Sequence, residues 1–338
     1  MIVTIDNISQ IVKILRFPLA ISVVMIHSFI NGCNNIFTYL LQNIIFLSVP
    51  LFFIISGFYF TNSSKPYKQK IKDRLKKIAI PYLIWNTIAW IVSLRNTGFT
   101  LPSFDTYVST PIDFPLWFLR DLFFLCLIQP LILWLASKYK GLILIFCCFV
   151  LYYFEYTIPY LEIRYNSIFF FSIGIILNTY IKIKPFNITK MAELYIYTIT
   201  SILFILTIIY RDFFKVDSIQ YSLYIVLGCI TMSLLLLRNI QRIHITQHYK
   251  EFGASSFFIY ASHTILINGA IKTICTHLPI PPELNIFLIS SFTCIICLLM
   301  FFYIKKIFSQ SLKNPKRRTN LNLTTQILYE INSRYTYL

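Results

Sequence analysis

The stretch LRFPLAISVVMIHSFI, residues 15–30, decides the fold class, because it is one apolar run that also holds an arginine and a histidine. A helix needs about 20 mainly apolar residues to cross a bilayer, and residues 9–31 provide that length. The run has no small-residue cleavage site, so we interpret it as a retained membrane helix and not as a signal peptide. Arg16 and His27 are therefore ionisable groups within a membrane segment, where such groups are costly and are functional candidates by default.

The rest of the chain repeats this apolar pattern. Of its 338 residues, 57% are hydrophobic and 13% are charged, whereas about 25% are charged in a soluble domain. The sequence predicts an all-α fold, a polytopic membrane bundle of about ten transmembrane helices. The expected spans are 9–31, 37–60, 78–95, 115–136, 141–158, 166–181, 192–210, 218–237, 254–274 and 285–304. They form one transmembrane domain over 1–308, and a basic cytoplasmic tail follows over 309–338.

The net charge of +17 is interpreted from the placement of the basic residues along the chain. Basic clusters occupy alternate loops, as in KPYKQKIKDRLKK at 65–77, IKIKPFNITK at 181–190 and RNIQRIHITQHYK at 238–250. The positive-inside rule places these loops and both termini in the cytoplasm. Membrane topology and lipid head groups account for most of this charge, so no nucleic-acid partner is expected.

Metal and redox motifs are not expected. Most of the eight cysteines lie in apolar runs, where a free cysteine packs as a small hydrophobic residue. Cys294 and Cys297 have the spacing of a metal motif, but the sequence around them offers no second ligand pair. The sequence also contains no Gly-rich phosphate loop, HExxH or GxSxG motif.

Arg16 and His27 share one face of the first helix. Their positions differ by 11 residues, which is close to three helical turns and separates them by about 16 Å along the helix axis. Taken alone, Arg16 can extend its charged head to the interface, and His27 can be a hydrogen-bonded core histidine. Their common face favours a functional groove along this helix.

The spacing of Arg16 and His27 resembles the signature of the acyltransferase 3 family, integral membrane enzymes that O-acylate, and usually O-acetylate, surface carbohydrates. Further patterns of this family follow in order along residues 11 to about 265. They are FFIISGFYF at 52–60, similar to FxxSG; KDRLKKIAIPYLIWN at 72–86, similar to a basic RxxR element; PLWFLRDLFFLCLIQPL at 115–131, similar to a WFL helix; and SSFFIYASHTILI at 255–267, similar to SxxIYxxH. The chain departs from the RxxR element, because Lys77 follows Arg74 where a second arginine is expected.

The resemblance implies a multi-pass O-acyltransferase of the bacterial inner membrane, which transfers an acyl group, expected to be acetyl, to a carbohydrate hydroxyl. The implied cofactor is cytoplasmic acetyl-CoA, with no metal, and the implied partners are a surface polysaccharide or lipid-linked glycan and membrane lipids. His27 is the expected catalytic residue, either as a neutral general base or as a transient acyl carrier. Arg16, Arg74 and Lys77 are expected to bind the donor phosphates, which guanidinium groups do better than an ammonium.

A second set of polar residues is expected to bind the acceptor: Ser56, Trp117, Arg120, Asp121, Arg164 and His263. Each has a structural alternative. Ser56, also a rival nucleophile, can be a helix-packing residue, and Trp117 can be an ordinary interfacial aromatic. The adjacent Arg120 and Asp121 can neutralise each other, Arg164 can anchor a helix end, and His263 can be a core histidine.

Two other classes of protein fit a polytopic chain. A transporter or flippase for a polysaccharide precursor is expected to show internal repeats or helices broken by Gly and Pro. No repeat is apparent in the sequence, and it has only 8 glycines. A structural membrane subunit is the third alternative, and it leaves the register of Arg16 and His27 as coincidence.

Overall fold

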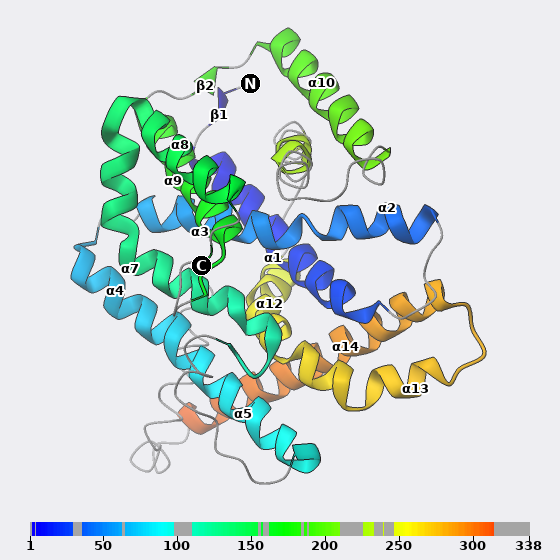
Figure 1. Ribbon diagram of the computed structural model, residues 1–338. Helices are drawn as coiled ribbons and strands as arrows, with labels where there is room; N and C mark the ends of the chain where they lie inside the picture. Colours follow the sequence, from blue (N-terminus) through cyan, green and yellow to red (C-terminus); the bar gives the residue numbers. More distant parts are fainter. Residues whose placement is uncertain are drawn as a thin grey trace.

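A computed structural model of the chain shows an all-helical protein (Figure 1). The structure describes residues 2–3, 5–29, 36–62, 65–97, 110–154, 157, 162–183, 186–187, 189–209, 226–232, 239 and 247–313. Its helices are α1 (Ile5–Ser28), α2 (Ile36–Ile45), α3 (Ser48–Asn62), α4 (Tyr67–Arg74), the π-helix η1 (Leu75–Ala79), α5 (Ile80–Thr97), the 3-10 helix η2 (Phe114–Leu116), α7 (Trp117–Ser137), the 3-10 helix η3 (Lys138–Gly141), α8 (Leu142–Tyr153), α9 (Tyr165–Ile183), α10 (Lys190–Ile209), α12 (Gln247–Leu266), the π-helix η5 (Ile267–Ile271), α13 (Lys272–Thr276) and α14 (Pro282–Lys313). A minimal ladder pairs β1 (Ile2–Val3) antiparallel with β2 (Phe186–Asn187). The predicted all-α class is confirmed.

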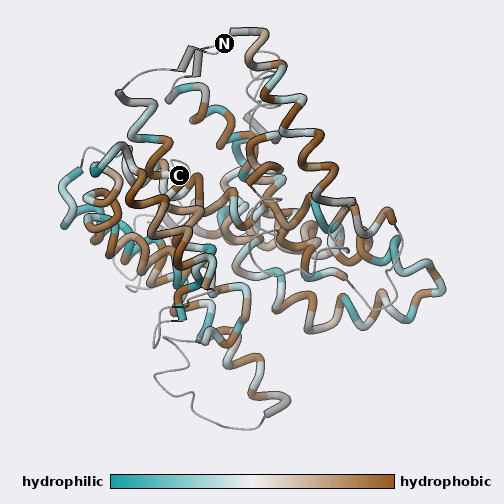
Figure 2. The backbone as a smooth tube through the Cα atoms, turned by 45° about the horizontal axis from the view of Figure 1, so that its top comes forward, coloured by the Kyte–Doolittle hydropathy of each residue, from teal (hydrophilic) through white to brown (hydrophobic). Residues whose placement is uncertain are grey.

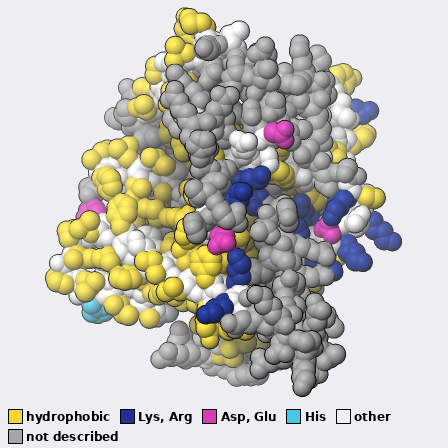
Figure 3. Space-filling view, turned by 180° about the vertical axis from the view of Figure 1, so that it is seen from behind, with side chains coloured by type: hydrophobic (Ala, Val, Ile, Leu, Met, Phe, Trp, Pro, Cys, Tyr) yellow, Lys and Arg dark blue, Asp and Glu magenta, His cyan; other side chains and the backbone are white. Residues whose placement is uncertain are grey.

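Several of these helices can cross a membrane. Within the described part of the chain, five segments are long and apolar enough: Ile8–Ser28, Ile36–Thr61, Tyr67–Leu94, Phe114–Ser137 and Pro282–Ile307. Hydrophobic residues line most of the described helices (Figure 2), and a broad hydrophobic patch covers the left of the view in Figure 3, whereas the Lys and Arg side chains lie in its centre and on its right. Large exposed apolar surfaces of this kind suit contact with lipid. The protein is therefore a multi-pass membrane protein, and the count of about ten membrane helices and the cytoplasmic termini stay predictions.

Several helix boundaries differ from the expected spans, and three of these differences have a clear structural basis or consequence. The span expected at 37–60 is two helices, α2 and α3, joined by a turn at residues 46–47. Pro50 explains the break, because a proline offers no N–H to the carbonyl group four residues earlier and its ring clashes with that carbonyl.

The other two differences concern the C-terminal helices. α12 begins at Gln247, before the expected 254, because its polar first turn is docked: the Tyr249 hydroxyl donates to the backbone carbonyl of Ile14. α14 continues to Lys313, past the expected domain boundary at 308. Residues 314–338 of the expected tail lie outside the described residues, as does most of the expected span 218–237.

The larger buried cluster is formed mainly by α1, α3, α7 and α9, and a second cluster joins α1 with α12 and α14. α1 packs against α12 and α14, α7 packs against α9, and α3 makes its main contact with α9. In Figure 1, α1 and α12 lie near the centre of the molecule, α4 lies on the left and α13 on the right, and α14 runs from the right across the lower part of the view toward α5. This arrangement brings the polar face of α1 against residues from α3, α7 and α12.

The contact of α3 with α9 depends on two glycines. A Cβ atom on Gly57 would lie 2.2 Å from the backbone oxygen of Phe171, and a Cβ on Gly174 would lie 2.1 Å from that of Ile54. Each helix therefore uses a glycine where the other helix's backbone passes, as small residues allow in membrane bundles. Gly57 is the residue of α3 that permits this close approach, and its neighbour Ser56 lines a cavity.

Alanine at Gly57 or Gly174 is expected to destabilise the protein, because the new methyl group meets backbone and cannot be relieved by a side-chain rotation. Overpacking typically costs about 1–3 kcal/mol, and a backbone clash belongs at the upper end of that range. Gly253→Ala is the control, since its Cβ would lie 3.9 Å from the nearest atom, the Lys13 oxygen. Thermal melting in detergent measures the effect, and equal melting of Gly57→Ala and Gly253→Ala would contradict the prediction.

Candidate functional site

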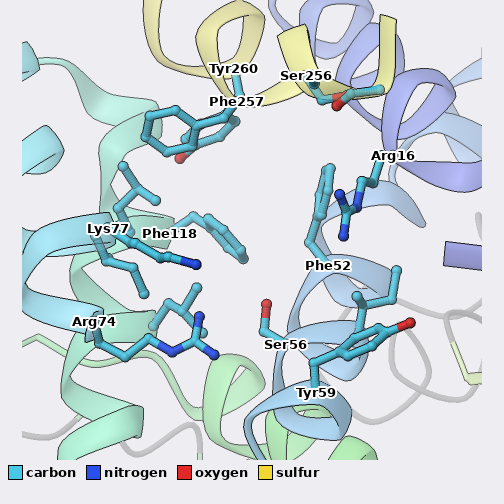
Figure 4. A pocket seen from close by; sticks show the side chains of 16 residues that line it. Arg16, Phe52, Ser56, Tyr59, Arg74, Lys77, Phe118, Ser256, Phe257 and Tyr260 are labelled. Atoms are coloured by element: carbon cyan, nitrogen blue, oxygen red, sulfur yellow. The ribbon is translucent and has the colours of Figure 1, made fainter. Parts of the chain in front are cut away.

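A cavity of about 170 Å³, which we call the inner cavity, is lined by the three cations expected to bind the donor. Arg16 comes from α1, Arg74 ends α4, and Lys77 lies in η1; Ser56 from α3 lines the same cavity. Figure 4 shows Arg16 on one side of this inner cavity, Arg74 and Lys77 on the other, and the Ser56 hydroxyl directed between them. The structure thus places four predicted site residues from separate helices around one space.

The walls of the inner cavity combine positive charge with apolar surface. Among the described residues that line it, none is acidic, and most of the others are apolar, such as Phe52, Leu122 and Phe257. The Arg74 guanidinium carbon lies 5.1 Å from the ring centroid of Phe60, a cation–π contact that restricts its orientation. A cavity lined by one sign of charge and low-dielectric walls concentrates ligands of the opposite charge.

A second cavity of about 220 Å³, which we call the outer cavity, is lined by His27 among other residues. Trp117 and Phe114, from the segment that begins α7, line this outer cavity, together with Arg164 and Asn166 at the start of α9. The Arg164 guanidinium carbon lies 4.0 Å from the ring centroid of Trp117 and 5.3 Å from that of Phe114. The predicted residues Trp117 and Arg164 therefore meet His27 in one space, next to the aromatic Phe114.

Phe118 and Tyr260 line both cavities and form the wall between them. Their ring centroids are 5.7 Å apart in an edge-on contact. The buried Tyr260 hydroxyl donates a hydrogen bond to the backbone carbonyl of Pro115, which fixes this side of the wall. Arg16 and His27 accordingly lie on opposite sides of the wall, as their separation along α1 requires.

His263 lies beside His27 and does not line either cavity. The ring centroids of the two histidines are 5.1 Å apart, and His263 is completely buried. Its Nδ1 lies 2.7 Å from the backbone oxygen of Tyr260. Because a carbonyl only accepts, Nδ1 carries a hydrogen, and in the neutral form of the ring Nε2 then holds the lone pair. Within the described part of the chain, this Nε2 has no hydrogen-bond partner.

Arg120 and Asp121 form a buried ion pair within α7, and neither lines the two cavities. The Arg120 Nη2 lies 2.8 Å from Asp121 Oδ1 and also donates to the backbone oxygen of Glu162 at 2.9 Å. The other carboxylate oxygen, Oδ2, accepts from the Arg164 backbone N–H at 3.2 Å and from the Ser167 hydroxyl at 2.7 Å. This geometry favours the alternative in which the pair neutralises itself, and it fixes the segment that carries Arg164.

Asp113 is a residue that sequence reasoning missed. Both of its carboxylate oxygens accept from the Thr264 hydroxyl, at 2.6 and 2.7 Å, and the Asn86 side-chain oxygen accepts from the backbone N–H of Ile112 at 3.0 Å. Burial raises the pKa of the Asp113 carboxyl to about 6, and the hydrogen bond from Thr264 opposes that rise. These contacts hold the turn that presents Phe114 and Trp117; the available signal was an aspartate next to FPLW at 114–117.

The fold and the two cavities describe a multi-pass helical membrane protein with a cationic pocket and a histidine pocket on either side of one wall. The family model described as an acyltransferase domain matches residues 10–302, and the chain belongs to the acyltransferase 3 family. Succinoglycan biosynthesis protein ExoH of Rhizobium meliloti (strain 1021) is 24% identical over an alignment of 172 residues, which covers 41% of this chain and 46% of that protein. The match therefore spans less than half of that relative, and no solved structure matches the chain.

Proposed function

We propose that the protein is a membrane O-acetyltransferase, which moves an acetyl group from cytoplasmic acetyl-CoA to a hydroxyl of a surface polysaccharide or lipid-linked glycan in a bacterial inner membrane. The observation that carries this proposal is the pair of cavities that meet at Phe118 and Tyr260, one cationic and one containing His27. Membership of the acyltransferase 3 family supports acyl transfer. The relative named for succinoglycan biosynthesis supports a polysaccharide acceptor.

The inner cavity suits the donor. Arg16, Arg74 and Lys77 supply positive charge for its phosphates, and the apolar lining suits its uncharged arm. The two guanidinium groups can each bind a phosphate through two N–H groups, whereas Lys77 acts as a point charge. A donor anchored there extends toward the wall and toward His27, about 16 Å from Arg16 along the helix axis.

The outer cavity suits the acceptor and the chemical step. His27 takes the proton from a sugar hydroxyl while the hydroxyl oxygen attacks the thioester carbonyl carbon. A C–O bond forms, the C–S bond breaks, and the proton on His27 passes to the departing thiolate. In the alternative route, His27 carries the acetyl group before the hydroxyl accepts it.

Transfer of labelled acetyl tests the proposed function. Membranes that hold the protein are incubated with acetyl-CoA labelled in its acetyl group, and glycan is then separated from lipid and protein. Label on glycan is expected, at a level well above that of membranes without the protein. If acceptor glycan is supplied and no label moves to it, the acyltransferase proposal is wrong and the transporter alternative gains support.

Arg16→Ala is expected to weaken donor binding about 10- to 100-fold, because hydrogen bonds to charged groups contribute about 1.5–3 kcal/mol. The apparent KM for acetyl-CoA in the labelled-acetyl assay measures this effect. Lys13→Ala is the matched control, since Lys13 lies on the same helix, is exposed, and does not line the inner cavity. An unchanged KM in Arg16→Ala would remove Arg16 from the donor site.

A further inference from the structure

We infer that the outer cavity binds an acceptor with an anionic substituent, a carboxylate or a phosphate, and that Arg164 is the residue that binds it. The inference rests on the proposed function, because it names the chemical class of the acceptor for the same site. It is carried by the orientation of Arg164, by the charges around it and by a buried, unpaired amide oxygen of Asn166, a residue that lines the same cavity.

Two aromatic rings hold the Arg164 guanidinium group in place. Its central carbon lies 4.0 Å from the Trp117 ring centroid and 5.3 Å from the Phe114 ring centroid. An arginine over an aromatic face keeps its N–H groups at the edge of its plane, where they can pair with two oxygens of a carboxylate or phosphate. The side chain is held before the ligand arrives, so less conformational freedom is lost on binding.

The charges around Arg164 leave its guanidinium available to a ligand. Of the described residues that line the outer cavity, none is acidic. Asp121 acts on Arg164 through space, but its carboxylate is occupied by Arg120, Ser167 and the backbone N–H of Arg164. Glu162 also acts through space, but its side chain is exposed and screened by water. An anionic group inside the cavity therefore meets a cation with no acidic neighbour beside it there.

Asn166 supplies a place for a hydroxyl group. Asn166 lines the same cavity, and its side-chain oxygen is buried and has no hydrogen-bond partner within the described part of the chain. A buried acceptor without a partner is unfavourable, and a sugar hydroxyl can satisfy it. With Arg164 for the anion, Asn166 for one hydroxyl and His27 for the reacting hydroxyl, the cavity fits an acidic sugar or a sugar phosphate.

Binding of small glycosides tests this inference. The protein in nanodiscs is titrated, at constant ionic strength, with methyl glucuronide, its uncharged methyl ester, glucose 1-phosphate and methyl glucoside, and tryptophan fluorescence reports binding. We expect at least one anionic probe to bind at least tenfold more tightly than its neutral counterpart. Preference for the glucuronide identifies a carboxylate on the sugar, and preference for the phosphate identifies the phosphate of a lipid-linked sugar.

Variants of Arg164 test whether the preference for anionic probes comes from this site or from the overall positive charge of the protein. Arg164→Gln is expected to remove the tenfold preference and leave the neutral probes unchanged, while Arg164→Lys retains part of it. Both variants keep the backbone N–H that donates a hydrogen bond to the Asp121 carboxylate. Lys138→Gln is the control, because Lys138 lies 5.7 Å from the ring centroid of the exposed Trp134, outside both cavities.

The outcomes distinguish the inference from the proposed function. Equal binding of charged and neutral probes by the wild type, or a full preference in Arg164→Gln, overturns the inference. The absence of measurable binding by every probe also overturns it. Labelled-acetyl transfer runs in parallel: transfer without charge preference contradicts the inference alone, and charge preference without transfer contradicts the proposed function alone.

Discussion

His27→Ala is expected to lower acetyl transfer to glycan at least about 100-fold, because general acid–base catalysis contributes about 10²–10⁴-fold. His27 lines the outer cavity, on the opposite side of the wall of Phe118 and Tyr260 from the three cations of the inner cavity. The loss is expected in kcat and not in the KM for acetyl-CoA, since Arg16 lies on the other side of that wall. A general fall in donor affinity would instead point to a distorted helix.

The control for this variant is His277→Ala. His277 is exposed, and its Nδ1 lies 2.7 Å from the backbone oxygen of Thr273, outside both cavities. It is expected to transfer acetyl at the wild-type rate when the two variants are present at equal levels. Equal transfer by His27→Ala and the wild type would remove His27 from the mechanism and move attention to its buried neighbour His263.

The two routes proposed for His27 differ in what remains on the protein. A transient acyl carrier takes up label from acetyl-CoA in the absence of acceptor, whereas a general base does not. Acid-quenched wild-type protein with label that is missing from His27→Ala would establish the carrier route. Unlabelled protein that still transfers acetyl to glycan would establish the general-base route.

The sequence places Arg16 and His27 on one face of a helix, but it did not predict the wall between the two cavities that these residues line. The positions of Arg16 and His27 on one helical face follow from the helix period alone. Phe118 and Tyr260 meet because α12 packs against η2, the short helix just before α7, where the Tyr260 hydroxyl donates to the carbonyl of Pro115, 145 residues away in the chain. A contact at that sequence separation depends on tertiary packing, and no local periodicity encodes it.

Hydropathy predicted the class of fold better than its helix boundaries. It measures whether a segment suits lipid, and a run such as 37–60 remains apolar across the turn that separates α2 from α3. The glycine contacts of α3 with α9 were missed for a related reason: the close approach at Gly57 exists only because Phe171 lies opposite. For Arg120 and Asp121, the sequence left two roles open, acceptor binding and mutual neutralisation. Their buried contacts favour mutual neutralisation.

Asp121→Ala is expected to destabilise the protein by about 3–5 kcal/mol, because removing one partner of a buried ion pair leaves the other charge uncompensated. Asp121 is completely buried, and its Arg120 partner is 4% exposed. The substitution also strands the Ser167 hydroxyl and the Arg164 backbone N–H, both of which donate to the carboxylate. Unfolding in mixed micelles with a denaturing detergent measures the change in free energy.

Asp73→Ala provides the matched control, because Asp73 pairs with Lys65 at the surface, where the Lys65 side chain is 50% exposed. Exposed ion pairs contribute about 0–1 kcal/mol, so this variant is expected to unfold close to the wild type. The double variant Arg120→Met/Asp121→Asn removes both charges and keeps an oxygen for the Arg164 N–H. We expect it to be more stable than Asp121→Ala, since the two sites are coupled. If Asp121→Ala unfolds like Asp73→Ala, the pair is not structural, and its role as an acceptor-binding site must be tested instead.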